Sequence, residues 1–441
     1  MARVDLPLSL LCISMTAFWF PTDVMLEKFF NSSRSGPGRV RSLRECQHGS
    51  LLDRFSGELI RSRYANITAR RHIRAAEHFA HWATSQGIAI AQWDKSVLER
   101  FGLHLRRRRC PFGHSGPTHQ LTGASLFLEH LRLAGIIRNA PAEPGDRPTL
   151  LISFRRWMRE QRGTQDAALD NYDRAICALL EHIEHNPGQL NARNLRQFFL
   201  MYNDGKSHTA IKRRATALRM FVRFLIAEGL CPVGLEACIP LVPHWRLSSL
   251  PRYLQPEEVE RTLALCDPTT AVGKRDRAIL LLLARLGLRA GDIVQLQLGD
   301  INWRDGWIHV SGKARRQTRL PLTQEVGNAL VFYLQQGRPQ TDSDRVFVRC
   351  RAPFRPFAAH HAVSAIVDRA IRRAGVTRPS RGAAHLLRHS VATSLLRQGV
   401  PLQDISKLLR HSSIQTTQIY AKVDVSSLYQ IAQPWPEVQP C

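Results

Sequence analysis

Two proline-rich breaks constrain how this chain of 441 residues can fold. The first contains Pro141, Pro144 and Pro148, and the second contains four prolines between residues 232 and 251. Proline has no backbone N–H and pushes the residue before it away from the helical region, so neither break can lie inside a helix. The chain is therefore expected to form separate units on either side of each break, and it is long enough for each unit to bury a core.

The segments on both sides of the first break are predicted to be helical, because their apolar residues recur at helical spacing. Phe221 lies 94 residues after Phe127, and Gly229 lies 94 residues after Gly135. This match favours two similar helical modules in tandem, with two unrelated helical segments as the alternative. Residues 21–50 show a mixed pattern, with a flexible loop predicted over 32–38. The predicted helices span residues 65–87, 96–107, 120–134, 167–185, 192–202 and 208–228.

The segment after the second break is predicted to mix helices with a small sheet. Pro256, followed by Glu257 and Glu258, is a typical helix start. A strongly apolar helix is expected over 276–288, and the chain after residue 321 is expected to be helical to about residue 430. The strands predicted between these helices span 301–303, 307–311 and 317–321. The predicted fold class is mainly α with a small antiparallel sheet.

The charge balance points to a polyanionic partner. The chain has 62 Lys+Arg against 36 Asp+Glu, a net charge of +26. Such a surplus repels itself unless a polyanion neutralises it, so nucleic acid is the leading partner and an anionic membrane surface the alternative. On the helix 208–228, Lys212, Arg213, Arg214 and Arg219 are candidates for contacts with DNA phosphates, although a solvated charged face is the ordinary reading. The same applies to residues 106–109.

The cysteines indicate no disulfide framework. Nine cysteines are scattered along the chain, which favours reduced thiols and a cytoplasmic protein. Cys46-x-His48 and Cys110-x-x-x-His114 could hold zinc only if both pairs converged, so no metal is expected.

The first twenty residues are largely apolar and resemble a short signal peptide. Asp5 and Pro7 interrupt the run, and no cleavage pattern precedes Pro21. An N-terminal arm or a misassigned start is therefore favoured over export. No later segment has the length and apolarity of a membrane span, so no membrane association is expected.

Two basic side chains stand at positions where chemistry is plausible. Arg289 follows an apolar helix between Gly287 and Gly291, where a guanidinium could grip an anion with two donors. The alternative is a structural pair with Asp292. Lys313 lies in a turn between two predicted strands, where Gly312 allows close approach of a ligand. A solvated lysine at a hairpin tip is the ordinary alternative.

Four further candidates lie between residues 385 and 420. His385 and Arg388 are three residues apart on a predicted helix and therefore share a face, which suits proton transfer at a phosphate. His389 is interpreted as a buried, hydrogen-bonded core histidine. His411 follows a predicted helix at a turn, and Tyr420 follows nine residues later on another predicted helix.

Arranged in this order, the six candidates resemble the tyrosine recombinase (phage integrase) family. The matching stretches are Gly287-Leu-Arg289, Gly312-Lys313, His385-Leu-Leu-Arg388-His-Ser-Val-Ala-Thr-Ser-Leu-Leu and Leu409-Arg-His411-Ser-Ser-Ile-Gln-Thr-Thr-Gln-Ile-Tyr420. The resemblance is strong over 250–435 and weaker over 148–230, which is similar to the family's core-binding domain. Two positions depart from the family pattern. Arg410 stands where glycine is usual, and Ala384 where proline is frequent.

The resemblance implies a role for each candidate. Tyr420 would attack a DNA phosphodiester and form a 3′-phosphotyrosyl link, without a cofactor or metal. Arg289 and Arg388 would hold the phosphate oxygens, and His385 would act as base. Two more residues complete the implied site: Lys313 would protonate the departing 5′-oxygen, and His411 would assist at the phosphate. Tyr429 is the rival nucleophile, but no histidine stands nine residues before it.

The resemblance also implies domains and partners. Double-stranded DNA with specific recombination sites would be the substrate, bound by a homotetramer that could include related recombinases, and a mobile element would encode the protein. A type IB topoisomerase and an inactive DNA-binding accessory protein are the alternatives. The predicted domains are an N-terminal arm at 1–50, an extra core-binding-like module at 51–140, the core-binding domain at 148–231, a linker at 232–251 and the catalytic domain at 252–435.

Overall fold

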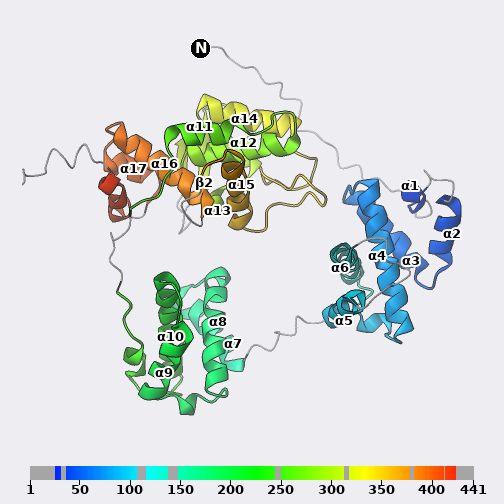
Figure 1. Cartoon of the computed structure of the whole chain (residues 1–441), viewed down its shortest axis with the longest axis horizontal. Helices are drawn as coiled ribbons and strands as arrows, with labels where there is room; N and C mark the ends of the chain where they lie inside the picture. The colour runs from blue at the N-terminus through cyan, green and yellow to red at the C-terminus, as the bar shows by residue number, and fades with distance from the viewer. Residues whose placement is uncertain are drawn as a thin grey trace, which may run out of the picture. The chain divides into compact units, whose positions relative to one another are not determined.

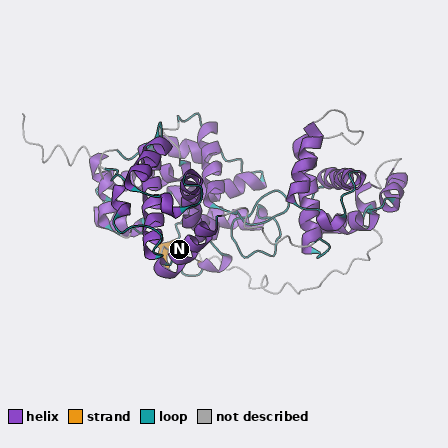
Figure 2. Cartoon of the chain, turned by 90° about the horizontal axis from the view of Figure 1, so that it is seen from below, coloured by secondary structure: helices purple, strands orange, loops and turns teal. Residues whose placement is uncertain are grey.

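In the computed structural model, the chain divides into two units. One is formed by residues 139–248 and the other by residues 1–138 together with 249–441. Helices dominate both units (Figures 1 and 2). The residues that the structure describes are 25–30, 36–106, 116–137, 148–243, 250–311, 317–377, 382–411 and 413–423.

The N-terminal part of the chain packs its helices around one core, which runs from Leu26 to Ile137. Residues 36–45 were predicted to begin inside a loop, yet they form a helix. Pro37 fits because a first helical turn needs no donor at that position, and Val40 and Leu43 bury one face. The helices are α1 (Glu27–Phe30), α2 (Gly36–Glu45), α3 (Gly49–Arg61), α4 (Asn66–Ser85), α5 (Lys95–Arg106) and α6 (Pro117–Leu133), with a 3-10 turn at Ile90–Gln92.

The unit 139–248 has a second core, from Leu151 to Ile239. Its helices are α7 (Thr149–Arg162), α8 (Asp166–His182), α9 (Ala192–Asn203) and α10 (His208–Ala227), with 3-10 turns at Pro187–Gln189 and Leu235–Cys238. The first of these turns stands between the second and third helices, as the turn at Ile90–Gln92 does among α3–α6. The element order thus recurs, while a shared role of the two modules stays a prediction.

The C-terminal part of the chain has the predicted mixed architecture. Strands β1 (Ile301–Asn302), β2 (Trp307–Ser311) and β3 (Gln317–Pro321) form an antiparallel sheet in the order β1-β2-β3, with Ile308 opposite Leu320. The predicted fold class, mainly α with a small antiparallel sheet, is confirmed. The helices are α11 (Pro256–Ala264), α12 (Ala271–Ala284), α13 (Ala290–Gln295), α14 (Gln324–Gln336), α15 (His360–Arg373), α16 (Ala383–Arg397) and α17 (Leu402–Leu408), with 3-10 turns at Leu298–Asp300, Ile414–Thr416 and Gln418–Val423.

Helix α12 is the centre of this part. Residues 278–284 are all buried, so this half of the helix is apolar on every side, and α11, α14 and α16 pack around α12 (Figure 1). The prediction that the chain is helical from residue 321 to about 430 is wrong between α14 and α15. Pro339, Pro353 and Pro356 disfavour a helix there, and two isolated bridges, such as Val348 with Pro356, form instead.

No helix in the described ranges has the length and apolarity that a bilayer crossing requires.

Candidate active site

The candidate site is assembled from three elements and one turn. Arg289 caps the start of α13, Arg388 lies in α16, and His411 follows α17. Tyr420 lies in the 3-10 turn Gln418–Val423, not in the predicted α-helix. Both arginines reach the same turn: the guanidinium groups of Arg289 and Arg388 each donate a hydrogen bond to the carbonyl oxygen of Leu409.

Arg388 is a buried cation without a carboxylate partner among the residues that the structure describes. It is 5% exposed, and its guanidinium donates to the carbonyl oxygens of Gly287 and Leu409. Burial, together with the neighbouring charges of Arg289 and Arg410, lowers the pKa of Arg388 to about 10. A buried guanidinium that only neutral carbonyls hold is an incompletely compensated charge, so it is suited to bind an anion.

Gly287 allows this approach. Its φ is +58°, which favours glycine, and a side chain there would come within 2.8 Å of Leu409 Cδ2. The backbone therefore turns tightly between α12 and α13, with the carbonyl of Gly287 directed at Arg388. The Gly-x-Arg pattern in the sequence thus has a steric basis.

Arg289 does not form the structural pair that was the alternative for it. Asp292 accepts a hydrogen bond from the backbone N–H of Arg289, at 2.9 Å, and its carboxylate forms an ion pair with Arg410. The guanidinium of Arg289 donates instead to the carbonyl oxygen of Arg410, at 2.9 Å. Burial and the charge of Arg410 lower the pKa of Arg289, while Asp292 opposes the shift. Arg289 and Arg388 are thus two cations held against one turn.

The side chain of Tyr420 is buried in a small apolar cluster. The side chain is 1% exposed and packs with Ala392, Leu396, Ile405 and Leu409. Burial raises the pKa of Tyr420 to about 12, although Arg388 counteracts it. The phenol is therefore a weaker acid in this state than in water, and DNA cannot reach it without a rearrangement.

His389 is the partner of the Tyr420 hydroxyl, at 2.7 Å from Nδ1 to the hydroxyl oxygen. Its interpretation as a hydrogen-bonded core histidine did not foresee this contact, because the partners are 31 residues apart. Burial, with the nearby charges of His385 and Arg388, lowers the pKa of His389 to about 4. The imidazole is thus neutral at pH 7 and forms a hydrogen bond with the phenol, but with a pKa of about 4 it is too weak a base to take the proton of Tyr420 in this state.

The other two histidines are placed differently. His385, the predicted base, is exposed in the first turn of α16, and its ring centroid lies 6.4 Å from that of His389. It makes no contact with the Tyr420 hydroxyl, so its role stays a prediction. His411 lies 2.8 Å from Thr417 Oγ1 through Nδ1. Burial, with the charges of Arg388 and Arg289, lowers the pKa of His411 to about 4.

Comparisons with known proteins identify the family. A model of the phage integrase family matches residues 252–427. An integrase/recombinase of Sinorhizobium fredii, y4rA, is 33% identical over 393 residues, which cover 87% of this chain and 93% of the relative. The chain belongs to the phage integrase family of tyrosine recombinases. It is therefore a site-specific recombinase, and the resemblance noted in the sequence is confirmed.

Further relatives agree with this recombinase assignment. The recombinase y4rF of Sinorhizobium fredii is 32% identical over 95% of this chain and 97% of its own length. Tyrosine recombinase XerD of Listeria innocua is 28% identical over 62% of this chain and 94% of its own length. Among solved structures, XerH bound to its palindromic difH substrate matches with a TM-score of 0.53 and 20% identity, covering 84% of this chain and 97% of that one. This last similarity supports the fold.

The remaining site predictions for the recombinase have different outcomes. Lys313 lies outside the described residues, between β2 and β3, so its role stays a prediction. Lys212 and Arg213 are exposed on α10. Arg214 and Arg219 are used inside the protein: Arg214 donates to the Tyr202 carbonyl at 2.6 Å and lies over its ring, and Arg219 donates to Ile239 and Pro240 carbonyls. The first pair is better suited to contact phosphates.

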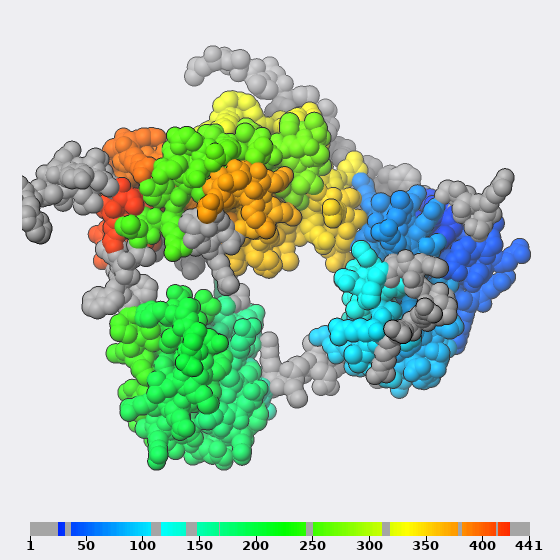
Figure 3. Space-filling model, viewed as in Figure 1, coloured from blue at the N-terminus to red at the C-terminus, as the bar shows by residue number. Residues whose placement is uncertain are grey.

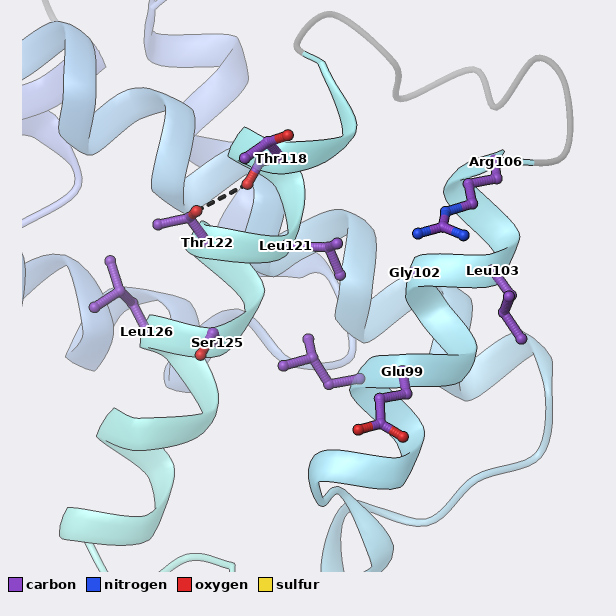
Figure 4. A pocket seen from close by; sticks show the side chains of 10 residues that line it. Glu99, Gly102, Leu103, Arg106, Thr118, Leu121, Thr122, Ser125 and Leu126 are labelled. Carbon is purple, nitrogen blue, oxygen red and sulfur yellow. Dashed lines mark hydrogen bonds between the residues drawn. The ribbon is translucent and has the colours of Figure 1, made fainter. Parts of the chain in front are cut away.

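One hollow of the recombinase is lined by none of these residues. It has a volume of about 840 Å³ and is formed by α5 and α6. Leucines line much of it, including Leu103 and Leu121, with Glu99 and Arg106 among the polar residues (Figure 4). Both helices belong to the N-terminal part of the chain, drawn in blue and cyan in Figure 3. None of the predicted catalytic residues contributes to this hollow.

Proposed function

We propose that Tyr420 is the nucleophile of this recombinase. Its oxygen attacks a DNA backbone phosphorus, a 3′-phosphotyrosyl bond forms, and the bond to the 5′-oxygen of the next nucleotide breaks. Attack by another 5′-hydroxyl reverses the step and joins a new strand, so the energy of the broken bond is kept and neither ATP nor a metal is needed. Supporting this role is the proximity of Tyr420 to Leu409, the residue whose carbonyl receives both site arginines.

In this proposal, Arg289 and Arg388 hold the two non-bridging oxygens of the phosphate. Charge develops on these oxygens in the pentavalent transition state, and pre-placed guanidinium groups stabilise it without reorganisation. The burial of Arg388 among carbonyl groups is the single observation that carries the assignment, because an anion would replace weak neutral partners with a charged one. His411 would add a hydrogen bond to the phosphate.

The proton of Tyr420 needs an acceptor. With a pKa of about 12, the phenolate at pH 7 lies roughly 7 kcal/mol above the phenol. His385 is the proposed base and would reach the hydroxyl after a rearrangement on DNA, whereas His389 contacts the hydroxyl in this state but is too weak a base to take its proton. Lys313 would protonate the leaving 5′-oxygen, a step for which arginine is too weak an acid.

The rest of the chain is proposed to bring DNA to this site. Residues 148–231 would act as the core-binding domain through α10, and 51–140 as an additional module. The working assembly would be a homotetramer on paired double-stranded sites in the bacterial cytoplasm, encoded by a mobile element. A solved relative supports the DNA part of this by analogy, since XerH is bound to its palindromic difH substrate.

A covalent-adduct assay tests the nucleophile. Nicked suicide duplexes made from the DNA that flanks the gene would be incubated with the full-length chain, and adducts resolved on denaturing gels. Wild type is expected to form an adduct that Tyr420→Phe cannot form, while both bind the duplex with similar affinity. An adduct in the Tyr420→Phe variant would disprove the assignment. Tyr429→Phe is the matched control and is expected to retain adduct formation.

The topoisomerase alternative needs a separate assay. A recombinase depends on paired sites, whereas a type IB topoisomerase relaxes any supercoiled plasmid. Supercoiled plasmids with and without two copies of the cleaved sequence distinguish them, because only the former should yield recombinant products.

A further inference from the structure

Arg410 occupies a backbone conformation that favours glycine. Its φ is +53°, at the turn that ends α17. There the N–H of Arg410 donates to the carbonyl of Lys407 and the N–H of His411 donates to that of Ser406, both at 3.0 Å. These two bonds define a Schellman turn, whose left-handed position is usually glycine. Any larger residue costs roughly 1 kcal/mol there, so an arginine calls for an explanation.

The stability of the fold does not explain the side chain of Arg410. It is 5% exposed and forms an ion pair through Nη2 with Asp292, which is 10% exposed. Its Nε and Nη1 atoms are buried and have no hydrogen-bond partner among the described residues. Each such donor costs about 1–3 kcal/mol, and a buried ion pair by itself gains little over apolar packing. The backbone strain and the two unsatisfied donors therefore offset much of what the ion pair contributes to stability.

Arg410 instead contacts the guanidinium of Arg289 directly and its backbone through Asp292. Its carbonyl oxygen accepts a hydrogen bond from the guanidinium of Arg289, at 2.9 Å. Its own guanidinium pairs with Asp292, and the carboxylate of Asp292 accepts the backbone N–H of Arg289, at 2.9 Å. Both the main chain and the side chain of Arg289 are therefore connected to Arg410.

We propose that Arg410 is a positioning residue: its ion pair with Asp292 fixes the turn before His411 against the start of α13 and thereby aims the guanidinium of Arg289 at the DNA phosphate. The inference rests on the proposed function of Arg289. At the position where the family usually has glycine, the side chain of Arg410 connects the turn before His411 with the start of α13, which carries Arg289.

Substitution by glycine tests this role. In Arg410→Gly the backbone strain is relieved, but Asp292 is left buried without its cation, so cleavage is measured well below the melting temperature of the variant. Single-turnover cleavage of the nicked suicide duplex, at saturating DNA, is expected to fall roughly 10-fold to 100-fold, as for a misplaced catalytic group. DNA affinity should stay within about threefold, because the phosphate-binding groups remain present. Arg410→Lys keeps the charge opposite Asp292 and should recover a large part of the cleavage rate.

Arg63 offers a matched control. It is also an arginine with positive φ, +55°, at the turn that ends α3, where its N–H donates to Ile60 and that of Tyr64 to Leu59. Arg63→Gly relieves the same strain outside the catalytic site. It should therefore leave the cleavage rate unchanged, whatever it does to the melting temperature.

A second measurement requires no DNA target. Nuclear magnetic resonance of the Arg289 guanidinium reports rotation about its Nε–Cζ bond, which should be restricted in wild type and in Arg410→Lys. Arg410→Gly and Asp292→Asn should each speed this rotation, and the double variant should add little to either, because both break one connection.

Three outcomes would overturn the inference. The first is Arg410→Gly with wild-type cleavage and wild-type restriction of Arg289. The second is a loss of DNA affinity with a reduced salt dependence, which would place Arg410 on the DNA. The third is a fall in cleavage that parallels a fall in melting temperature and that lysine does not rescue. If wild type forms no adduct at all, the proposed function fails, and the rotation of Arg289 still decides whether Arg410 positions it.

Discussion

Arg155 and Arg388 are both arginines with 5% exposure, yet their surroundings differ in charge. Arg155, in α7, forms ion pairs with Asp166, Asp170 and Asp173. Burial opposes its charge, but the three carboxylates outweigh burial and raise the pKa of Arg155. Arg388 contacts neutral carbonyls, and burial lowers its pKa to about 10. The charge of Arg155 is thus neutralised within the protein, whereas the charge of Arg388 remains available to bind an anion.

The largest expected effect comes from Arg388. Arg388→Gln removes the uncompensated charge, so cleavage of a suicide duplex should fall on the order of 100-fold or more, as when one transition-state donor is lost. The melting temperature should not fall in parallel, because a disfavoured buried charge has been removed. Single-turnover kinetics and calorimetry check both. A variant that unfolds early but cleaves normally when folded would show that Arg388 is structural, like Arg155.

Arg155 should give the reverse result. Arg155→Gln leaves Asp170 and Asp173 without their cation, while Arg159 still pairs with Asp166, and it should destabilise the unit 139–248. Loss of a buried partner costs about 3–5 kcal/mol, but Asp166 and Asp170 are more than half exposed, so about 2 kcal/mol is expected. Urea denaturation measures it. Cleavage at saturating DNA and low temperature should be close to wild type; a specific loss of chemistry would contradict the comparison.

A smaller effect is expected from lowering the pH, because protonation of His389 would place another positive charge near Arg388. The folded-state pKa of His389 is about 4, below the ordinary 6.5, so the unfolded chain binds more protons between these values. Stability should therefore fall as pH drops below about 6.5, by about 1 kcal/mol at pH 5.5 for this one group. His389→Gln should remove this share of the dependence of melting temperature on pH, while His72 and His411, whose pKa values are also lowered to about 4, keep theirs. An unchanged profile would mean that His389 does not resist protonation.

The sequence carried much of this architecture in local patterns. Strands β2 and β3 have the predicted bounds, and α9 starts at the predicted residue, because alternation and capping residues such as Asn191 act over short distances. Helix α2 was missed because glycine and proline at its start suggest a loop. The non-helical stretch between α14 and α15 was missed although its prolines were visible.

The candidate site, too, was predicted from the sequence only in part. The order of the six candidates carries the family resemblance, and the structure brings Arg289, Arg388 and His411 to one turn. The hydrogen bond between His389 and Tyr420 could not be predicted from the sequence pattern, because the two residues are 31 positions apart. The ion pair between Asp292 and Arg410 spans 118 positions of the chain. Contacts of this kind are set by packing, which no local pattern encodes.

The carbonyl of Leu409 has a consequence for how activity would be lost and gained. Because a single peptide group receives both Arg289 and Arg388, neither arginine can be tuned without disturbing the other. A substitution that shifts this peptide should therefore weaken the contributions of Arg289 and Arg388 together, rather than one at a time.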